Sequence, residues 1–220
     1  MEMDWVIWQL ADSAFPSGGF AHSGGLEATM QWREVDRDRL ADFIQTSLIQ
    51  VGHGSLPFVG AVHSAPEQLG RLDQLCDAFL SNHVANRASR SQGRAFLASA
   101  DAAFASHEIA ELRRSSKHNQ LAGHFPPLFG AVTAALRVHV EQAARLFLFL
   151  TLRSLISSAI RLGIVGPLQG QAIQHRLGPF CERVAQGCRK QREEDIAQTS
   201  PVIDVLQATH DRLYSRLFQS

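Results

Sequence analysis

The sequence predicts an all-α fold, a single-domain bundle of about nine or ten helices around a buried central helix at about 139–162. Apolar residues recur at helical spacing in several segments, as they do on the buried stripe of an amphipathic helix. The sequence has no alternating apolar and polar run of useful length, and no Asn-Gly or Asp-Gly hairpin signal. Its 220 residues suffice for one domain with a sizeable core. We expect this domain to span 1–220.

Two segments in the first half predict amphipathic helices with one buried stripe each. The apolar positions of these two stripes are Leu40, Phe43, Ile44, Ser47, Leu48 and Val51, and then Leu69, Leu72, Leu75, Cys76, Phe79 and Leu80. An alanine-rich helix is expected from about Val84 to Phe104, with Gly93 as its only glycine. Residues 139–162 carry charge only at Glu141, Arg145, Arg153 and Arg161, which is typical of a helix buried on most sides.

Glycine and proline mark the boundaries of the other helices. GHFPPLFG at 123–130 indicates a helix stop followed by a start, and Gly163 and the Gly-Pro pair at 166–167 end the central helix. A helical pattern resumes over 168–184. Ser200 is expected to cap a last helix and Pro201 to take its first position. The residues expected to share one face of that helix are Val202, Val205, Leu206, Thr209, Leu213 and Leu217.

Composition argues against several classes of protein. The 21 basic and 21 acidic residues balance, so no general attraction to nucleic acid or to an anionic membrane is expected. The longest uncharged, strongly apolar run, LFLFLTL, is far shorter than the roughly 20 residues that cross a bilayer. The N-terminus lacks a secretory signal, and three cysteines without a CxxC pair favour a reducing compartment. We therefore expect a soluble, cytoplasmic protein.

The stretch ADSAFPSGGFAHSGGLE at 11–27 invites a catalytic or phosphate-binding interpretation. Gly19 and Gly24 have the spacing of a P-loop, but Gly25 and Leu26 stand where that motif needs lysine and serine or threonine. The nucleophile elbow GxSxG is absent. The ten histidines form no HxxxH or HExxH pair. Backbone turns are thus the expected role of these glycines, and no metal site is expected.

Arg87, Arg90 and Arg94 form a basic stripe along one face of the helix expected at about 84–104, because they are spaced by three and four residues. Guanidinium groups hold phosphates or carboxylates. No exposed aromatic residues interleave with them, so nucleic-acid binding is disfavoured, and an ion-pair network or a protein interface is favoured. Since no active site is assembled, the residues point to a binding or scaffold role.

QLADSAFPSGGFAHSGGLE at 9–27 resembles the N-terminal signature of the UreF family of urease accessory proteins. Four later segments agree with this family in the right order, so the resemblance covers the whole chain. They are SRSQGRAFL at 89–97, GHFPPLFGAV at 123–132, SSAIRLGIVGPLQGQ at 157–171 and SPVIDVLQATHDRLYSRLFQS at 200–220.

The resemblance implies an all-α, usually dimeric protein that catalyses no reaction itself. Such a protein is expected to bind a UreD-type (UreH-type) accessory protein and to recruit a UreG-type GTPase, so that nickel reaches apo-urease, and to gate hydrolysis of GTP. Nickel and GTP are then handled by the partners. No catalytic, cofactor-binding or metal-binding residue is expected in this chain.

The resemblance also implies partner contacts at three places. In the first motif, a turn is expected to expose Ser17, Phe20 and His22, because an aromatic residue in a rigid loop offers much contact area at low entropic cost. The second place is the segment at 89–97. A glycine within a helix costs about 1 kcal/mol relative to alanine, so at Gly93 either a close helix approach or a partner contact is expected. The third place is a docking segment at about 196–220. The complete set of predicted contact residues is Ser17, Gly18, Gly19, Phe20, His22, Glu27, Arg90, Gln92, Gly93, Asp204, Tyr214, Ser215, Arg216 and Phe218.

Two other functions stay open at this point. A small-molecule enzyme on a helical fold would use His22 or His124 in a pocket, and a cluster of Glu, His and Arg in one cleft would favour it. A large exposed apolar patch would instead favour an assembly factor. A direct nickel chaperone would need histidines from two protomers that converge at a symmetric interface.

Overall fold

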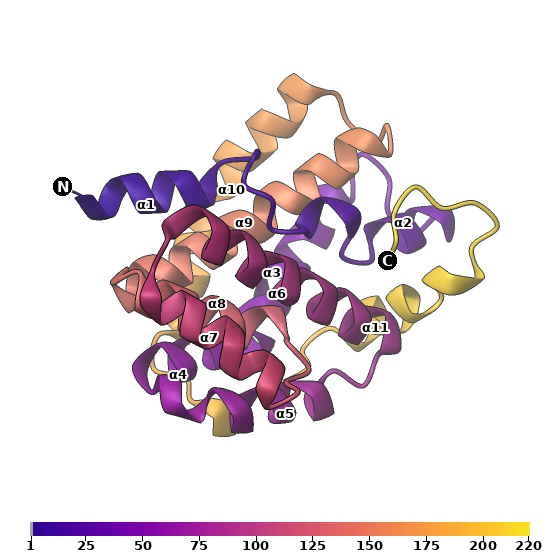
Figure 1. The fold of residues 1–220 in the computed structure, drawn as a ribbon. Helices are drawn as coiled ribbons and strands as arrows, with labels where there is room; N and C mark the ends of the chain where they lie inside the picture. The colour runs from indigo at the N-terminus through magenta and orange to yellow at the C-terminus, as the bar shows by residue number, and fades with distance from the viewer. Residues whose placement is uncertain (1) are drawn as a thin grey trace.

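The computed structural model describes residues 2–220, with side chains from Trp5 onward. Every regular element in this range is a helix, so the predicted all-α class is confirmed (Figure 1). The α-helices are α1 (Glu2–Ala11), α2 (Leu26–Gln31), α3 (Leu40–Gly54), α4 (Leu56–Ser64), α5 (Leu69–Phe79), α6 (His83–Phe104), α7 (His107–His118), α8 (Phe125–Ala135), α9 (Val140–Arg161), α10 (Pro167–Cys188) and α11 (Pro201–Ala208). Short 3-10 turns lie at η1 (Gly19–Ala21), η2 (Pro66–Gln68), η3 (Glu193–Asp195) and η4 (His210–Arg212).

The predicted central helix is α9. It begins after His139, whose ring accepts the backbone N–H of Glu141, and α3, α4, α8 and α10 pack against it. Among the described residues, α9 is the helix long and apolar enough to span a membrane by length and composition, and 56% of its most apolar window is buried inside the protein. Its apolar character is thus explained by its place in the core.

Glycine allows α6 to approach the start of α8 closely. A Cβ atom added at Gly93 would lie 2.3 Å from the carbonyl oxygen of Gly123, far inside van der Waals contact. Next to this crossing, the ring of Phe96 meets that of Phe125 edge to face at 5.4 Å, and Phe125 stacks on Phe147 of α9 at 5.2 Å. Close packing therefore accounts for the glycine at 93 within the helix.

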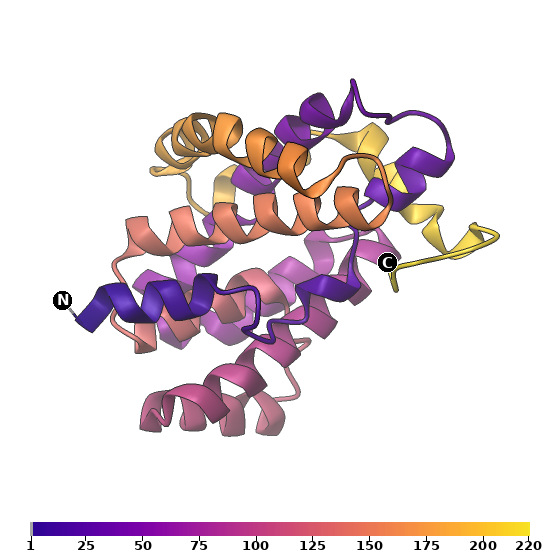
Figure 2. The ribbon, with the colours of Figure 1, turned by 90° about the horizontal axis from the view of Figure 1, so that it is seen from above.

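The end of the chain differs from the prediction. α11 begins at Pro201 as expected, although the Ser200 side chain makes no capping hydrogen bond, and the helix already ends at Ala208. Leu213 and Leu217 therefore do not share a face with Val202. Residues 209–220, which we call the tail, instead turn back toward α2 (Figures 1 and 2). The helix does not continue through this apolar pattern, because buried contacts with α2 hold the tail in another path, as described below.

Candidate functional site

The loop between α1 and α2 lies on α6. The hydroxyl of Ser99 in α6 donates to the carbonyl oxygen of Pro16 at 2.8 Å, and a Cβ atom at Gly19 would lie 3.0 Å from the side-chain nitrogen of Gln92. This packing forms a small cavity of about 190 Å³. Its lining includes the predicted contact residues Ser17, Gly18, Gly19, Phe20 and Gln92. The structure therefore brings the first two motifs together.

Arg161, at the end of α9, lies between two phenylalanine rings. Its guanidinium carbon is 3.8 Å from the ring centroid of Phe20 and 4.1 Å from that of Phe218, and its Nη1 donates to the Phe20 carbonyl oxygen at 2.6 Å. The Phe20 ring is 71% exposed, whereas Phe218 is only 5% exposed. One arginine thus joins the loop motif to the tail by cation–π contacts.

The buried carboxylate of Glu27 in α2 anchors the tail. It accepts the backbone N–H of Leu217 at 2.6 Å, the backbone N–H of Phe218 at 3.2 Å, and a hydrogen bond from Nε2 of buried His210 at 3.0 Å. Gly25, which precedes α2, has φ +87°, a conformation that glycine adopts without strain. It brings the backbone against Gln207, whose Cβ is 3.2 Å from where a Cβ of residue 25 would lie.

The last two residues of the tail pair with the loop backbone. The N–H of Gln219 donates to the Ala21 carbonyl oxygen at 2.9 Å, and the N–H of Ser23 donates to the Ser220 carbonyl oxygen at 2.7 Å. Nδ1 of His22 lies 2.5 Å from the Ser220 hydroxyl oxygen. Burial lowers the pKa of His22, and the electrostatic effects of nearby Arg87 and His210 lower it further. His22 is therefore favoured in its neutral form.

Asp211 joins the tail to α6 through charged groups. Both of its carboxylate oxygens accept from Arg87, at 2.8 and 3.1 Å, and Arg216 and His83 lie within 3.3 and 3.4 Å of it. These charges, chiefly the hydrogen bonds from Arg87, lower the pKa of Asp211. Asp204 in α11 is held as well, since the side-chain amide of Asn82 donates to its carbonyl and carboxylate oxygens.

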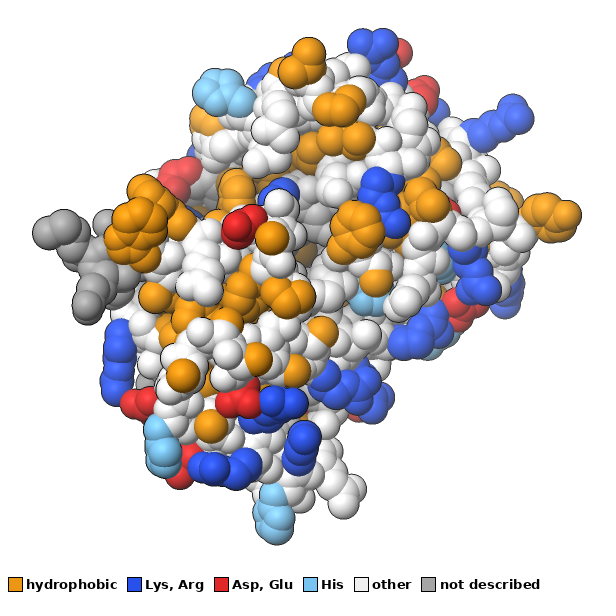
Figure 3. Space-filling view, turned by 45° about the horizontal axis from the view of Figure 1, so that its top comes forward, with side chains coloured by type: hydrophobic (Ala, Val, Ile, Leu, Met, Phe, Trp, Pro, Cys, Tyr) orange, Lys and Arg blue, Asp and Glu red, His pale blue; other side chains and the backbone are white. Residues whose placement is uncertain are grey.

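Exposed hydrophobic side chains surround this anchored tail. Tyr214 is fully exposed and Leu217 is more than half exposed. Phe20 in the loop, Trp32 directly after α2, and Val202 and Val205 in α11 are also exposed. The Trp32 indole donates to Thr209 at 2.9 Å, which keeps α2 beside the tail. Figure 3 shows hydrophobic side chains spread over the centre, left and top of one face of the molecule, and basic side chains along its lower and right-hand edges.

The predicted contact residues differ in how far they are exposed. Phe20 is exposed as expected, but Ser17 and His22 are only half exposed, because the loop packs on α6 and His22 contacts Ser220. Glu27 and Phe218 are buried and bind other parts of the same chain. Of the other predicted residues, Gly93 is buried, Arg90, Gln92 and Asp204 are half-buried, and Tyr214, Ser215 and Arg216 are exposed. Contact of any of these residues with a partner stays a prediction.

Sequence reasoning missed the residues that hold the tail in place. These are Arg161, His210, Asp211 and Ser220. Arg161 had a usable signal, because it is one of few charges on an otherwise apolar central helix. Asp211 had a weaker one, since it lies within the family-like segment at 200–220 without belonging to a helical stripe. His210 gave no distinguishing signal, as it is one of ten scattered histidines.

The two histidines considered for catalysis are not placed together in an open pocket. His124 is fully buried, with Nε2 3.0 Å from an oxygen of Asp77 and Nδ1 3.1 Å from the hydroxyl of Ser89. That hydroxyl also accepts the N–H of Phe125, so it caps the start of α8. In residues 5–220, no three His, Cys, Asp or Glu side chains are grouped so as to hold a metal ion.

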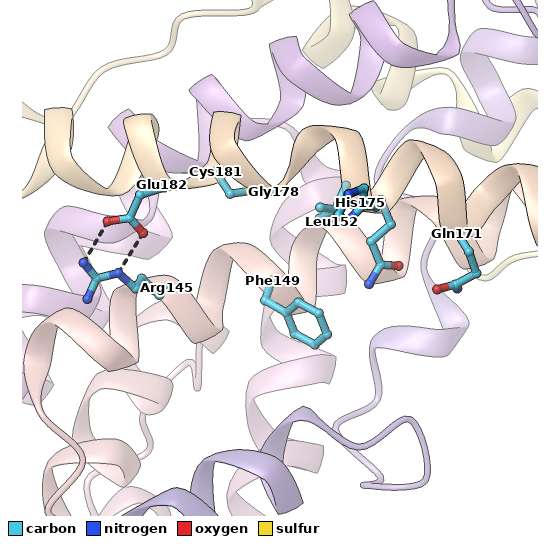
Figure 4. Close-up of a pocket in the computed structure, with 9 residues that line it drawn as sticks. Arg145, Phe149, Leu152, Gln171, His175, Gly178, Cys181 and Glu182 are labelled. Atoms are coloured by element: carbon cyan, nitrogen blue, oxygen red, sulfur yellow. Dashed lines mark hydrogen bonds and ion pairs between the residues drawn. The ribbon is translucent and has the colours of Figure 1, made fainter.

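A larger cavity of about 470 Å³ lies between α9 and α10. Figure 4 shows Arg145 and Glu182 paired at one end and Phe149 and His175 farther along. The pKa of Cys181 in this cavity is raised to about 11 by burial, so its thiol stays protonated at neutral pH. A protonated thiol is a weak nucleophile. Arg145, His175 and Glu182 line the same cavity, as the enzyme hypothesis requires, but the Glu182 carboxylate is held by two hydrogen bonds from Arg145.

The family model described as UreF matches residues 35–178. Urease accessory protein F of Arabidopsis thaliana is 38% identical over 226 residues, which cover 99% of this chain and 93% of that protein. Urease accessory protein F of Oryza sativa subsp. indica is 38% identical over 219 residues, covering 97% and 84%. Urease accessory protein UreF of Trichodesmium erythraeum is 28% identical over 223 residues, covering 97% and 95%. The chain therefore belongs to the UreF family of urease accessory proteins.

Proposed function

We propose that this chain acts in urease maturation as a non-catalytic scaffold in the cytoplasm. It binds a UreD-type (UreH-type) protein and recruits a UreG-type GTPase, so that nickel is inserted into apo-urease. In this proposal the chain is a homodimer and modulates GTP hydrolysis by the GTPase. Nickel and GTP are bound by the partners and not by this chain.

The observation that carries the proposal is the anchored tail. Buried contacts at Glu27, His210 and Phe218 fix its backbone, while Tyr214 and Leu217 project into solvent. A rigid backbone that presents exposed apolar and aromatic side chains loses little conformational entropy on binding. Such side chains are typical of the residues that dominate protein interfaces. The surface around the tail is thus suited to docking another protein.

The state of two candidate catalytic groups, His124 and Cys181, supports a role without catalysis. His124 uses both ring nitrogens inside the protein, and Cys181 retains its proton at neutral pH. General acid–base catalysis needs a titratable group within reach of a substrate, and buried His124 does not meet that condition.

The test is co-expression of this chain with a UreD-type protein and a UreG-type GTPase, followed by size exclusion with light scattering. A dimer that becomes a larger complex of defined stoichiometry is the expected result. The double variant Tyr214→Ala/Leu217→Ala should lose the UreD-type protein from this complex. Leu168→Ala, which removes an exposed leucine from α10, is the matched control and should retain it.

Point variants are preferable to deletion of residues 199–220. The deletion would also expose Glu27 and remove the ring that covers Arg161, so it would alter the folded body along with the docking surface. Three proteins that elute separately at all salt concentrations and nucleotide states would reject the scaffold. A complex that the double variant leaves intact would reject the tail as the docking surface.

A further inference from the structure

The start of α6 borders an open polar cleft that the proposed docking surface does not use. Its volume is about 440 Å³. The residues that line it are Leu80, Ser81, His83, Asn86, Arg87, Arg90 and Arg94. The three arginines are one basic stripe, because residues three and four apart lie on the same face of a helix.

Only the first arginine of the stripe has an acidic partner in residues 5–220. Arg87 holds the Asp211 carboxylate through two hydrogen bonds of 2.8 and 3.1 Å. Across the same part of the chain, neither Arg90 nor Arg94 has a carboxylate within 4.0 Å. Two guanidinium groups therefore line the cleft without a counter-ion.

The elements packed around the cleft do not neutralise this charge. Asp77 in α5 is near enough for Arg90 to lower its pKa, but its carboxylate already accepts from Asn86 at 2.9 Å and contacts His124 at 3.0 Å. Asp211 is engaged with Arg87. Three arginines thus face two carboxylates that other groups already bind, and the cleft is locally positive in a chain of zero net charge.

We propose that this cleft binds an acidic segment of a partner protein, with carboxylates in the forks of Arg90 and Arg94. A carboxylate is favoured because the anion that the stripe already holds, Asp211, is one, and it occupies the Arg87 fork with two bonds. Arg90 and Arg94 present the same planar guanidinium group farther along the helix. Their spacing of about 5–6 Å per helical turn matches acidic side chains three or four residues apart on a partner helix.

Asp211 acts in this arrangement as an internal competitor. The Asp211 carboxylate occupies the guanidinium group of Arg87, which is one of the three in the stripe. Removal of this carboxylate makes a third guanidinium group available to the incoming segment. The cleft shares the Arg87–Asp211 pair with the tail, but the inference is tested on this chain alone, without the partners of the tail-docking proposal.

The test uses fluorescein-labelled hexaglutamate and the full chain, with binding followed by fluorescence anisotropy. Arg90→Gln/Arg94→Gln should weaken binding about tenfold or more, since each lost fork removes charge-assisted hydrogen bonds. Asp211→Asn should strengthen it several-fold. The matched controls are Arg176→Gln/Arg183→Gln in α10 and Asp101→Asn in α6, which make the same changes of charge away from the cleft. Circular dichroism verifies that each variant is folded.

Three results would overturn the proposal. One is unchanged binding by the folded Arg90→Gln/Arg94→Gln variant. Another is an equal loss of affinity in the Arg176→Gln/Arg183→Gln control, which would show that binding depends only on the net charge of the chain. The third comes from competition against the labelled peptide. If inorganic triphosphate displaces labelled hexaglutamate at much lower concentrations than unlabelled hexaglutamate does, the cleft prefers phosphate groups.

Discussion

The carboxylate of Glu27 accepts the backbone N–H of Phe218 at 3.2 Å, although the two residues are 191 positions apart in the sequence. The same carboxylate also holds Leu217 and His210. One buried side chain in α2 therefore fixes three points of the tail. Together with the Arg87–Asp211 pair and the backbone pairing at Gln219 and Ser220, this residue sets the position of the tail.

Glu27→Gln should release the tail. Glutamine keeps the size of the side chain but replaces one acceptor oxygen with an NH₂ donor, which would face a backbone N–H of the tail. Losing a hydrogen bond to a charged group in a buried site costs about 2 kcal/mol, so the free energy of unfolding in urea should fall by that amount. Hydrogen exchange of residues 210–220 should accelerate at the same time.

Glu67→Gln is the matched control for this change. Glu67 is an exposed residue of η2, so the same substitution there should leave both stability and exchange unchanged. Tail amides that exchange equally slowly in Glu27→Gln and in the unaltered chain would show that the tail does not depend on the carboxylate.

Gly93→Ala should destabilise the protein by about 3 kcal/mol. The new methyl group would meet the Gly123 carbonyl oxygen at 2.3 Å, and two backbones would have to separate, which is an overpacking cost. Gly187→Ala is a sharp contrast, because that helical position has no atom within 4 Å of an added Cβ. It should stabilise the chain by up to about 1 kcal/mol through helix propensity. Equal effects of the two variants in urea unfolding would contradict the close approach of α6 to the start of α8.

How far the sequence predicts this structure depends on the range of the interactions. The limits of α9 follow from local patterns, because an apolar segment bounded by His139 and Gly163 carries its own signals. Close packing at Gly93 was one of two expectations for that residue. The early end of α11 was not predictable in this way, because Leu213 and Leu217 continue the helical spacing. Contacts with Glu27, far away in the sequence, override that local preference.

The candidate site illustrates the same limit. The sequence motifs indicated Phe20, Glu27 and Phe218 as important residues, but they gave no means to tell a contact within the chain from a contact with a partner. Arg161 connects the two motifs only because the end of α9 reaches both rings. Spatial pairing of this kind needs the tertiary structure.

Stability should decline as the pH falls from about 7.5 toward 5.5. The pKa values of His22 and His124 are lowered in the folded protein, chiefly by burial, below the value of 6.5 for a free histidine. As the pH falls through 6.5, the unfolded chain takes up protons before the folded chain does, so unfolding is favoured. The slope is at most about 1.4 kcal/mol per pH unit for each histidine, and urea unfolding at several pH values measures it.

His22→Gln should flatten this pH dependence, because it removes one of the two histidines. His107→Gln is the control for loss of an imidazole, since His107 is exposed on α7. The free energy of unfolding could fall with pH below 7 just as steeply in His22→Gln as in the unaltered chain. In that case protonation of His22 does not contribute to the pH dependence.

Phe20→Ala should weaken assembly much more than it weakens the fold. The ring is 71% exposed, and its cation–π contact with Arg161 contributes about 0.5–1 kcal/mol at such a site, so the free energy of unfolding should change little. An exposed aromatic residue held by an arginine is a typical interface anchor, and its loss should raise the Kd of the complex with the accessory partners about tenfold or more.

Isothermal titration calorimetry with the purified partners measures the Kd for Phe20→Ala, and urea unfolding measures its stability. Phe20→Tyr keeps an aromatic ring over Arg161 and should retain most of the affinity, whereas Leu168→Ala tests whether any exposed apolar side chain has the same effect. Affinity unchanged in Phe20→Ala would mean that the ring serves only to cover Arg161. Affinity lost together with stability would assign Phe20 to the internal packing of the loop, because a ring that acts mainly through a partner contributes little to the isolated fold.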